Sequence, residues 1–432
     1  MKYAPVLCAV FCILCSVSKA QWLETTIQLP DSSEPIALCY NPTDNKVYSA
    51  NCNGGNVTVV DGATNGVLAT VTAGSYLYAL CYNPQNNRVY CANGESNNVT
   101  VIDGVTDSVI ATVTAEDQPA ALCYNPQNNK IYCANNGSAN VTVIDGATDS
   151  VITTVTAGAS SHALCYNHQN NKVYCANYNS HTVTVIDGAT DSVLATVPTW
   201  LYPYALCYNP QNNKVYCANS GNDNVTVIDG ATNSVVATIT VGYAPYALCY
   251  NPENNKVYSG NASWPSGSVT VIDGATDSVL ATVTAGDIPR ALCYNPENNK
   301  VYCANWYYDS VVTVIDGESN QVLRTISVGD APVAFCHNPV QNRVYVANEY
   351  GNSISVLRDS MSGIEESLKP QAAGSRPAAT VVRGLPSGAV AFDAMGRRVV
   401  SAKPGVYFVR AEPSAVSREP SAVIVRKVVI QR

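Results

Sequence analysis

The chain repeats one stretch, Ala121-Leu-Cys-Tyr-Asn-Pro-Gln-Asn-Asn-Lys-Ile-Tyr-Cys-Ala-Asn135, followed by Val141-Thr-Val-Ile-Asp-Gly146 and Val151-Ile-Thr-Thr-Val155. The opening alanine of each copy falls at residues 37, 79, 121, 163, 205, 247, 291 and 334. The spacing is therefore 42 residues, lengthening to 44 and 43 near the end. A fixed period of this size is typical of a solenoid, a propeller or a tandem array.

Each copy contains four short segments with the composition of β-strands, which we call A, B, C and D. In the second copy they are Ala79–Tyr82, Arg88–Ala92, Val99–Ile102 and Val109–Val113. They are rich in Val, Ile, Thr and Tyr and too short for helices. Asn83-Pro-Gln-Asn-Asn87 and Asp103-Gly104 supply turn residues between them. Four antiparallel strands in about 42 residues predict one blade of an all-β propeller.

The number of copies predicts how the ring closes. Seven complete sets of strands run from Ala37 to about Val328, and the eighth set lacks a D strand. A D-like segment, Leu23–Leu29, stands alone before the first copy. We predict that it completes the last blade three-plus-one, because closure removes open sheet edges. The result is an eight-bladed propeller. A seven-bladed ring is the alternative, if the degenerate last copy stays outside it.

The cysteines raise the question of disulfides. Of the 17 cysteines, ten form five pairs spaced like Cys81 and Cys91. If the A–B turn has three residues, side chains that alternate along the strands fall on two faces of the blade. One face carries Leu80, Tyr82 and Tyr90, and the other carries Ala79, Cys81, Val89 and Cys91. The paired cysteines would then lie diagonally, with Cα atoms roughly 7–8 Å apart, beyond the usual disulfide range. We expect buried thiols. Disulfides, which an oxidising destination permits, are the alternative.

The repeat resembles a known family. The hairpin "NNKVYCAN" followed by "VTVIDGATDSVLATVTAG" is similar to the YVTN-type β-propeller repeat of bacterial and archaeal surface and exported proteins. The resemblance covers about residues 23–357, although Tyr-Val-Ala-Asn itself occurs only at 345–348. It implies a propeller, more often of seven blades, and an exported protein. It implies no shared catalytic residues.

The two ends of the chain suggest export. Residues 1–20 have one early positive charge, an apolar run and Ser18-Lys-Ala20, the pattern of a secretory signal peptide. The apolar run is too short for a bilayer, so we expect a mature chain from Gln21 without a membrane span. Residues 358–378 have the composition of a linker. Residues 379–432 contain "FDAMGRRVV", "GVYFVR" and "RKVVIQR", which resemble the C-terminal sorting domain of type IX secretion substrates.

That second resemblance implies contact with the outer-membrane secretion machinery and a location outside a bacterial cell, secreted or on its surface. A plain β-sandwich-like accessory domain is the alternative. Residues 21–375 hold 29 acidic and 12 basic side chains, a net charge of −17. So acidic a body argues against a nucleic-acid partner.

Candidate binding residues come from the contrast between loops. The A–B and C–D turns are nearly identical between copies, whereas the D–A and B–C loops vary and carry many aromatic residues. Uniform turns indicate scaffold, and variable aromatic loops indicate recognition. The candidate ligand-binding residues are Tyr78, Tyr178, Trp200, Tyr202, Tyr204, Tyr246, Trp264, Trp306, Tyr307 and Tyr308. The alternative is that these rings only cover the ends of the blades.

We expect no catalytic residue, cofactor or metal ion. Asp-Gly-Ala-Thr-Asp-Ser resembles part of a calcium loop but lacks the remaining ligands, so we interpret it as a turn. His162 and His181 have no identifiable third partner for a metal. The predicted function is a non-enzymatic binding or scaffold module for a protein or glycan. One alternative is a lactonase-like hydrolase or a lyase acting at the channel mouth, with Glu116 and Asp287 as candidates. A self-assembling surface-layer component is the other.

Overall fold

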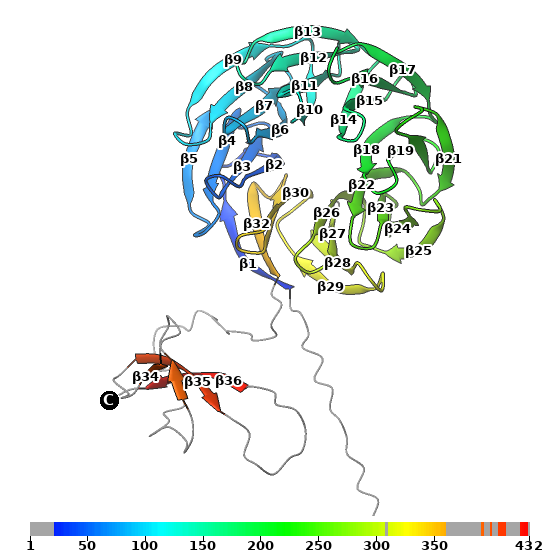
Figure 1. Ribbon diagram of the computed structural model, residues 1–432. Helices are drawn as coiled ribbons and strands as arrows, with labels where there is room; N and C mark the ends of the chain where they lie inside the picture. The colour runs from blue at the N-terminus through cyan, green and yellow to red at the C-terminus, as the bar shows by residue number, and fades with distance from the viewer. Residues whose placement is uncertain are drawn as a thin grey trace, which may run out of the picture. The chain divides into compact units, whose positions relative to one another are not determined.

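The computed structural model describes residues 21–306 and 310–359, together with the backbone of four short strands between residues 390 and 430. In the first part, eight four-stranded antiparallel sheets surround a central channel (Figure 1). The expectation of eight blades is therefore confirmed. Among the described residues, no helix is long and apolar enough to cross a bilayer.

Seven blades are built from consecutive strands, with strand A innermost and strand D at the rim. Blade 1 comprises β2 (Pro35–Asn41), β3 (Lys46–Asn51), β4 (Asn56–Asp61) and β5 (Val67–Thr72). Blade 2 comprises β6 (Leu77–Asn83), β7 (Arg88–Asn93), β8 (Asn98–Asp103) and β9 (Val109–Thr114). Blade 3 comprises β10 (Pro119–Asn125), β11 (Lys130–Asn135), β12 (Asn140–Asp145) and β13 (Val151–Thr156). Blade 4 comprises β14 (Ser161–Asn167), β15 (Lys172–Asn177), β16 (Thr182–Asp187) and β17 (Val193–Pro198).

The remaining consecutive blades follow the same order. Blade 5 comprises β18 (Pro203–Asn209), β19 (Lys214–Asn219), β20 (Asn224–Asp229) and β21 (Val235–Thr240). Blade 6 comprises β22 (Pro245–Asn251), β23 (Lys256–Asn261), β24 (Ser268–Asp273) and β25 (Val279–Thr284). Blade 7 comprises β26 (Pro289–Asn295), β27 (Lys300–Asn305), β28 (Val311–Asp316) and β29 (Val322–Ser327).

Blade 8 closes the ring with strands from both ends of the propeller. It comprises β30 (Pro332–Asn338), β31 (Arg343–Asn348), β32 (Ser353–Asp359) and, at the rim, β1 (Gln21–Gln28). β1 pairs antiparallel with β32, for example Ile27 with Ile354. Three-plus-one closure by the orphan segment is confirmed.

The A–B turn corrects the predicted side-chain faces. Asn83 pairs with Arg88, so the turn has four loop residues rather than three. Leu80 therefore lies opposite Cys91, and Cys81 opposite Tyr90. Because one extra residue moves every later side chain to the other face, the predicted assignment of strand B was wrong.

The same register separates the two paired cysteines of one blade. Cys81 and Cys91 sit on opposite faces of their sheet, so they cannot bond to each other. All 14 cysteines among the described residues are free thiols, as expected. Burial raises the pKa of Cys39 to about 12, so its thiol is uncharged at neutral pH and a poor nucleophile.

The core lies between blades. At the interface of blades 2 and 3, Tyr90, Val101 and Val113 pack on Ile131 and Cys133. Eight such clusters occur, one at each junction of neighbouring blades. A blade cannot bury both faces alone, so the ring is stable only as a whole.

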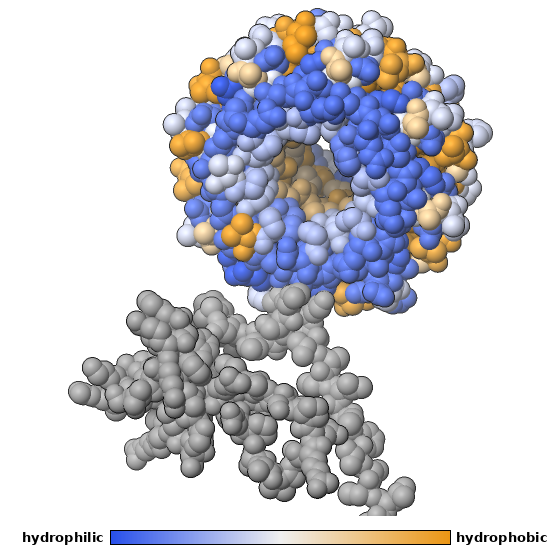
Figure 2. All heavy atoms as spheres, viewed as in Figure 1, coloured by the Kyte–Doolittle hydropathy of each residue, from blue (hydrophilic) through white to orange (hydrophobic). Residues whose placement is uncertain are grey.

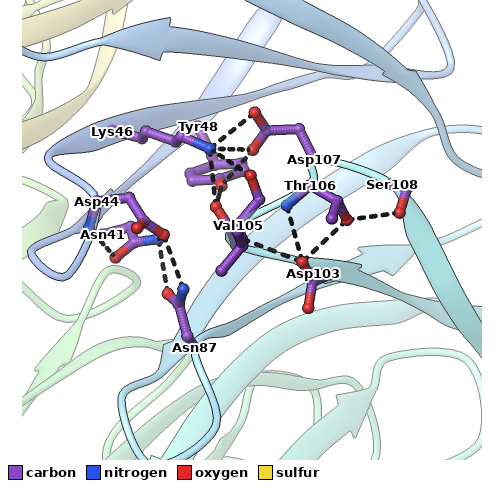
Figure 3. A network of polar contacts seen from close by, with 11 residues as sticks. Asn41, Asp44, Lys46, Tyr48, Asn87, Asp103, Val105, Thr106, Asp107 and Ser108 are labelled. Atoms are coloured by element: carbon purple, nitrogen blue, oxygen red, sulfur yellow. Dashed lines mark hydrogen bonds and ion pairs between the residues drawn. The ribbon is translucent and has the colours of Figure 1, made fainter.

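Polar clasps join each blade to the next (Figure 3). Lys46 Nζ lies 2.8 Å from Asp107 Oδ2, and Tyr48 Oη donates to Asp107 Oδ1 over 2.8 Å. Asp107 is the second aspartate of the Asp-Gly-x-Thr-Asp turn. The first, Asp103, accepts hydrogen bonds from the backbone N–H groups of Val105 and Thr106. Both carboxylates thus have protein partners, in line with the interpretation of this motif as a turn rather than a calcium loop.

The rim carries pairs of exposed apolar side chains. In blade 2, Ala111 pairs with Val101 and Val109 with Ile102, which leaves Ile110 as a β-bulge. Val109 and Ile110 are consequently both exposed, by 42% and 45%. The D strands of blades 1 to 7 each repeat this pair, and Figure 2 shows hydrophobic residues spaced along the circumference around a hydrophilic inner ring.

The C-terminal unit contains a separate antiparallel sheet of β33 (Val390–Phe392), β34 (Arg398–Val399), β35 (Gly405–Ala411) and β36 (Ile424–Ile430), in the order β34-β33-β35-β36. All four strands lie within residues 379–432. The expected signal peptide at 1–20 and almost all of the expected linker lie outside the described residues.

Candidate ligand-binding site

The loops gather at two ends of the channel according to their type. Gly94 N donates to Tyr76 O over 2.7 Å, which joins a B–C loop to a D–A loop. Gly104 N donates to Asn87 O over 2.8 Å, which joins a C–D turn to an A–B turn. We call the first end the variable face and the second the uniform face. The candidate site lies on the variable face.

One position in each A strand is set apart from the rest. It is the second residue of the strand, directly before the repeated alanine. In blade 5, Pro203 pairs with Asn219 and Ala205 with Ala218, so Tyr204 between them is a β-bulge. The same irregularity occurs in all eight A strands. Bulges redirect side chains and are common beside functional sites.

We call this the mouth position. Its occupants in blades 1 to 8 are Ile36, Tyr78, Ala120, His162, Tyr204, Tyr246, Arg290 and Val333. No two neighbouring blades except 5 and 6 carry the same residue, although the following Ala, Cys and Asn positions are constant. The scaffold is therefore uniform where it builds blades and varied where it meets the channel.

Seven of the eight mouth residues line a cavity of 650 Å³ at the variable end of the channel. The remaining walls come from the D–A and B–C loops, namely Glu34, Cys52, Tyr76, Gln118, Asn136 and Glu349. The volume falls within the range of small-molecule and cofactor sites.

Aromatic rings from blades 4, 5 and 6 form one continuous group. Tyr178 stacks on Tyr202 with ring centroids 4.7 Å apart. Tyr204 lies 4.4 Å from His162 and 4.7 Å from Tyr246. We call these five residues the aromatic cluster. Such rings offer flat apolar faces together with hydroxyl groups at their edges.

Arg290 joins the aromatic cluster to the next blade. The carbon of its guanidinium lies 5.3 Å from the ring centroid of Tyr204 and 5.2 Å from that of Tyr246. Both contacts are within cation–π range. Burial, and then the charge of Arg290, lowers the pKa of His162 to about 4. His162 is therefore neutral at pH 7, and Arg290 supplies the positive charge of this side.

The cavity wall beside Arg290, from blades 8 and 1, is acidic. Glu34 comes from blade 1 and Glu349 from blade 8, and Trp306 Nε1 donates to Glu349 Oε2 over 2.8 Å. Burial raises the pKa of Cys52 to about 11, and the carboxylates of Glu34 and Glu349 add to that shift. The mouth is therefore mixed in charge, with the aromatic cluster on blades 4 to 6, a cation on blade 7 and two carboxylates on blades 8 and 1.

The predicted binding residues fall into five groups. Tyr78 and Tyr204 line the cavity. Tyr178, Tyr202 and Tyr246 belong to the aromatic cluster. Trp306 does not line the cavity itself but donates a hydrogen bond to Glu349, which does. Trp200 and Trp264 are 50% and 65% exposed and do not line it. Tyr307 and Tyr308 lie outside the described residues.

Sequence reasoning missed Arg290, Glu34 and Glu349, and it considered His162 only as a metal ligand. One clue was available in the sequence. When the eight copies are compared, the residue directly before the repeated alanine varies between copies. Of the two carboxylates named for a hydrolase, Glu116 is exposed and Asp287 buried, and neither lines the cavity.

No group of three or more His, Cys, Asp and Glu side chains able to hold a metal ion occurs among the described residues. His181 Nδ1 instead accepts a hydrogen bond from the backbone N–H of Tyr202 over 3.1 Å.

Comparison with known proteins supports the fold. A model of the family described as "Lactonase, 7-bladed beta-propeller" matches residues 103–202, which include blades 3 and 4. That stretch is too short to bear on the number of blades. No curated protein matches the chain.

Two solved structures illustrate the likeness. Sqt1 of Saccharomyces cerevisiae is 12% identical, with a TM-score of 0.68 over 79% of this chain and 99% of its own. Hydrazine synthase of Kuenenia stuttgartiensis is 17% identical, with a TM-score of 0.54 over 78% and 99%. At these identities the similarity concerns architecture. The chain is thus a β-propeller with a lactonase-like segment.

Proposed function

We propose that the protein is an exported, non-enzymatic recognition module that binds a cell-surface glycan at the mouth of its channel. The observation that carries the proposal is the group of His162, Tyr204, Tyr246 and Arg290, which β-bulges place at the most variable position of the A strand. The rest of the repeat is occupied with packing and clasps.

A glycan fits this surface better than an extended protein interface does. Tyr78 and Tyr204 line the cavity, where a sugar could stack on a ring, and rings are efficient anchors because little conformational freedom is lost on binding. Gln118 and Asn136 line the same cavity and can exchange hydrogen bonds with hydroxyl groups. A concave site of 650 Å³ holds a short saccharide.

Export is the second part of the proposal. Its basis is the signal-peptide pattern at 1–20 and the resemblance of residues 379–432 to a type IX sorting domain, which would engage the outer-membrane machinery. The propeller's reduced cysteines are compatible with an oxidising exterior. They are partly or fully buried, and burial raises their pKa values, so thiolates are scarce.

A binding screen tests the proposal. The full chain is offered immobilised glycans and surface proteins, alongside the Tyr204→Ala and Tyr243→Ala variants. Tyr243 is 65% exposed on a D–A loop but does not line the cavity, so it serves as the matched control. We expect a glycan ligand and at least a tenfold loss of affinity in Tyr204→Ala only. Equal binding by both variants would contradict the site, and a protein ligand would contradict the glycan.

A hydrolase is the second candidate, since the lactonase family model matches residues 103–202. Glu34 and Glu349 would be its carboxylates, because both line the cavity. Turnover of a lactone or oligosaccharide by the full chain, abolished in Glu34→Gln or Glu349→Gln, would replace the non-enzymatic proposal.

A further inference from the structure

Arg290 is the one mouth residue that carries a charge at pH 7. The lysines and arginines that begin the B strands lie on the uniform face instead, where they bind turn side chains and carbonyl groups. Within residues 21–306 and 310–359, no carboxylate oxygen lies within 4.0 Å of the Arg290 guanidinium. An arginine in a concave site without a counter-ion has strong donors to offer a ligand.

The surroundings favour a planar anion. The guanidinium lies over the Tyr204 and Tyr246 rings, which restrict its orientation and limit its contact with water. Arginine presents paired N–H donors that match the two oxygens of a carboxylate. His162 beside it carries no charge at pH 7, and among the described lining residues Arg290 is then the one cation.

We propose that the mouth recognises an acidic sugar, a uronic-acid-type residue whose carboxylate binds Arg290 while its ring stacks on Tyr204. This deepens the proposed function and rests on it. The stacking ring and the cation lie side by side, because Tyr204, on which the sugar would stack, also contacts the Arg290 guanidinium.

The acidic side of the cavity sets the direction of the ligand. Glu34 and Glu349 repel a carboxylate but accept hydrogen bonds from sugar hydroxyls. An acidic sugar therefore enters with its carboxylate toward blade 7 and its hydroxyl edge toward blades 8 and 1. A neutral sugar lacks the first contact.

Titration calorimetry on the full chain tests this assignment. The probes are trigalacturonate, a mannuronate trimer and sialyllactose, each beside its methyl ester, which keeps the sugar but removes the negative charge. The variants are Arg290→Gln, Arg290→Lys and the control Arg358→Gln. Arg358 pairs with Glu24 and contacts the A–B turn of blade 8, so its replacement makes the same charge change on the uniform face.

We expect at least one acidic probe to bind at least tenfold more tightly than its ester. Arg290→Gln should remove that preference, Arg290→Lys should retain a smaller one, and Arg358→Gln should leave it intact. If an acid and its ester bound with equal affinity and Tyr204→Ala still weakened binding, the carboxylate assignment would be wrong. The proposed function would still stand. If no saccharide bound, both would fall.

Discussion

Asn338 Nδ2 donates a hydrogen bond to Asn45 Oδ1 over 2.9 Å, although 293 residues separate them in the chain. The bond joins blade 8 to blade 1. Equivalent Asn–Asn bonds join all seven remaining pairs of neighbouring blades, from Asn41–Asn87 to Asn295–Asn342. They form an unbroken ring on the uniform face. The degenerate last repeat is therefore a full member of the propeller.

Removing β1 should open that ring. A chain lacking residues 21–28 exposes the edge of β32 and loses the pair between Arg343 and Glu24, which is 2.5 Å long. Open edges invite pairing with other chains. We expect a lower melting temperature and self-association in gel filtration. Glu24→Gln, which keeps the strand, should remain monomeric. A monomer of unchanged melting temperature after the deletion would show that β1 does not close the propeller.

The clasp between blades 7 and 8 should contribute more stability than the others. Lys300 Nζ lies 2.7 Å from Asp359 Oδ1, and the two side chains are only 1% and 0% exposed. Asp359→Asn leaves the buried Lys300 charge without its counter-ion, at a cost of about 3–5 kcal/mol in the free energy of unfolding. Urea unfolding measures it.

Asp107→Asn is the matched control for that substitution. The chain already places Asn233 opposite Lys172 and Asn320 opposite Lys256 at the same clasp position. The site in blade 2 should therefore tolerate asparagine at about 1 kcal/mol. Equal costs for Asp359→Asn and Asp107→Asn would mean that burial does not decide the strength of a clasp.

His162 should make the protein less stable in mild acid. Its folded-state pKa of about 4 lies below the ordinary value of 6.5. Between those values the unfolded chain binds the proton more readily, so stability is complete above pH 6.5 and falls as the pH drops toward 4. The loss is at most about 3 kcal/mol. His162→Gln should flatten the melting temperature between pH 7 and 4.5. An unaltered slope would show that His162 does not cause it.

The thiols should be free but protected. We expect a thiol reagent to modify the folded chain slowly, since burial raises the pKa values of Cys39 and Cys165 to about 12. In denaturant without reductant, alkylation and mass spectrometry should find all 14 propeller cysteines modified. If two cysteines were alkylated only after a reductant was added, they would form a disulfide, and this part of the structure would be contradicted.

Much of the fold could be predicted because repetition averages out local ambiguity. Eight copies of one pattern gave the strands, the blade and the closure by Leu23–Leu29. The face of Cys91 was mispredicted because it depends on whether the A–B turn has three or four loop residues. A turn rich in Asn and Pro suits either length. A change of one residue in the turn moves the side chains of strand B to the other face of the sheet.

The site was predictable only in part for a related reason. Aromatic residues such as Tyr204 stand out in composition, so the variable face could be named. The bulge that directs each mouth residue is a backbone feature with no residue type of its own. Arg290, Glu34 and Glu349 therefore looked like ordinary loop charges. Their convergence depends on blades far apart in sequence meeting around one channel.

Hydrogen–deuterium exchange of the full chain, with and without a bound saccharide, locates the binding site. We expect protection only at the variable ends of the A strands, at residues 160–164, 202–206 and 288–292, while the A–B turns such as residues 84–87 exchange as before. Protection of those turns or of the D strands at the rim, with the mouth unaffected, would contradict that expectation.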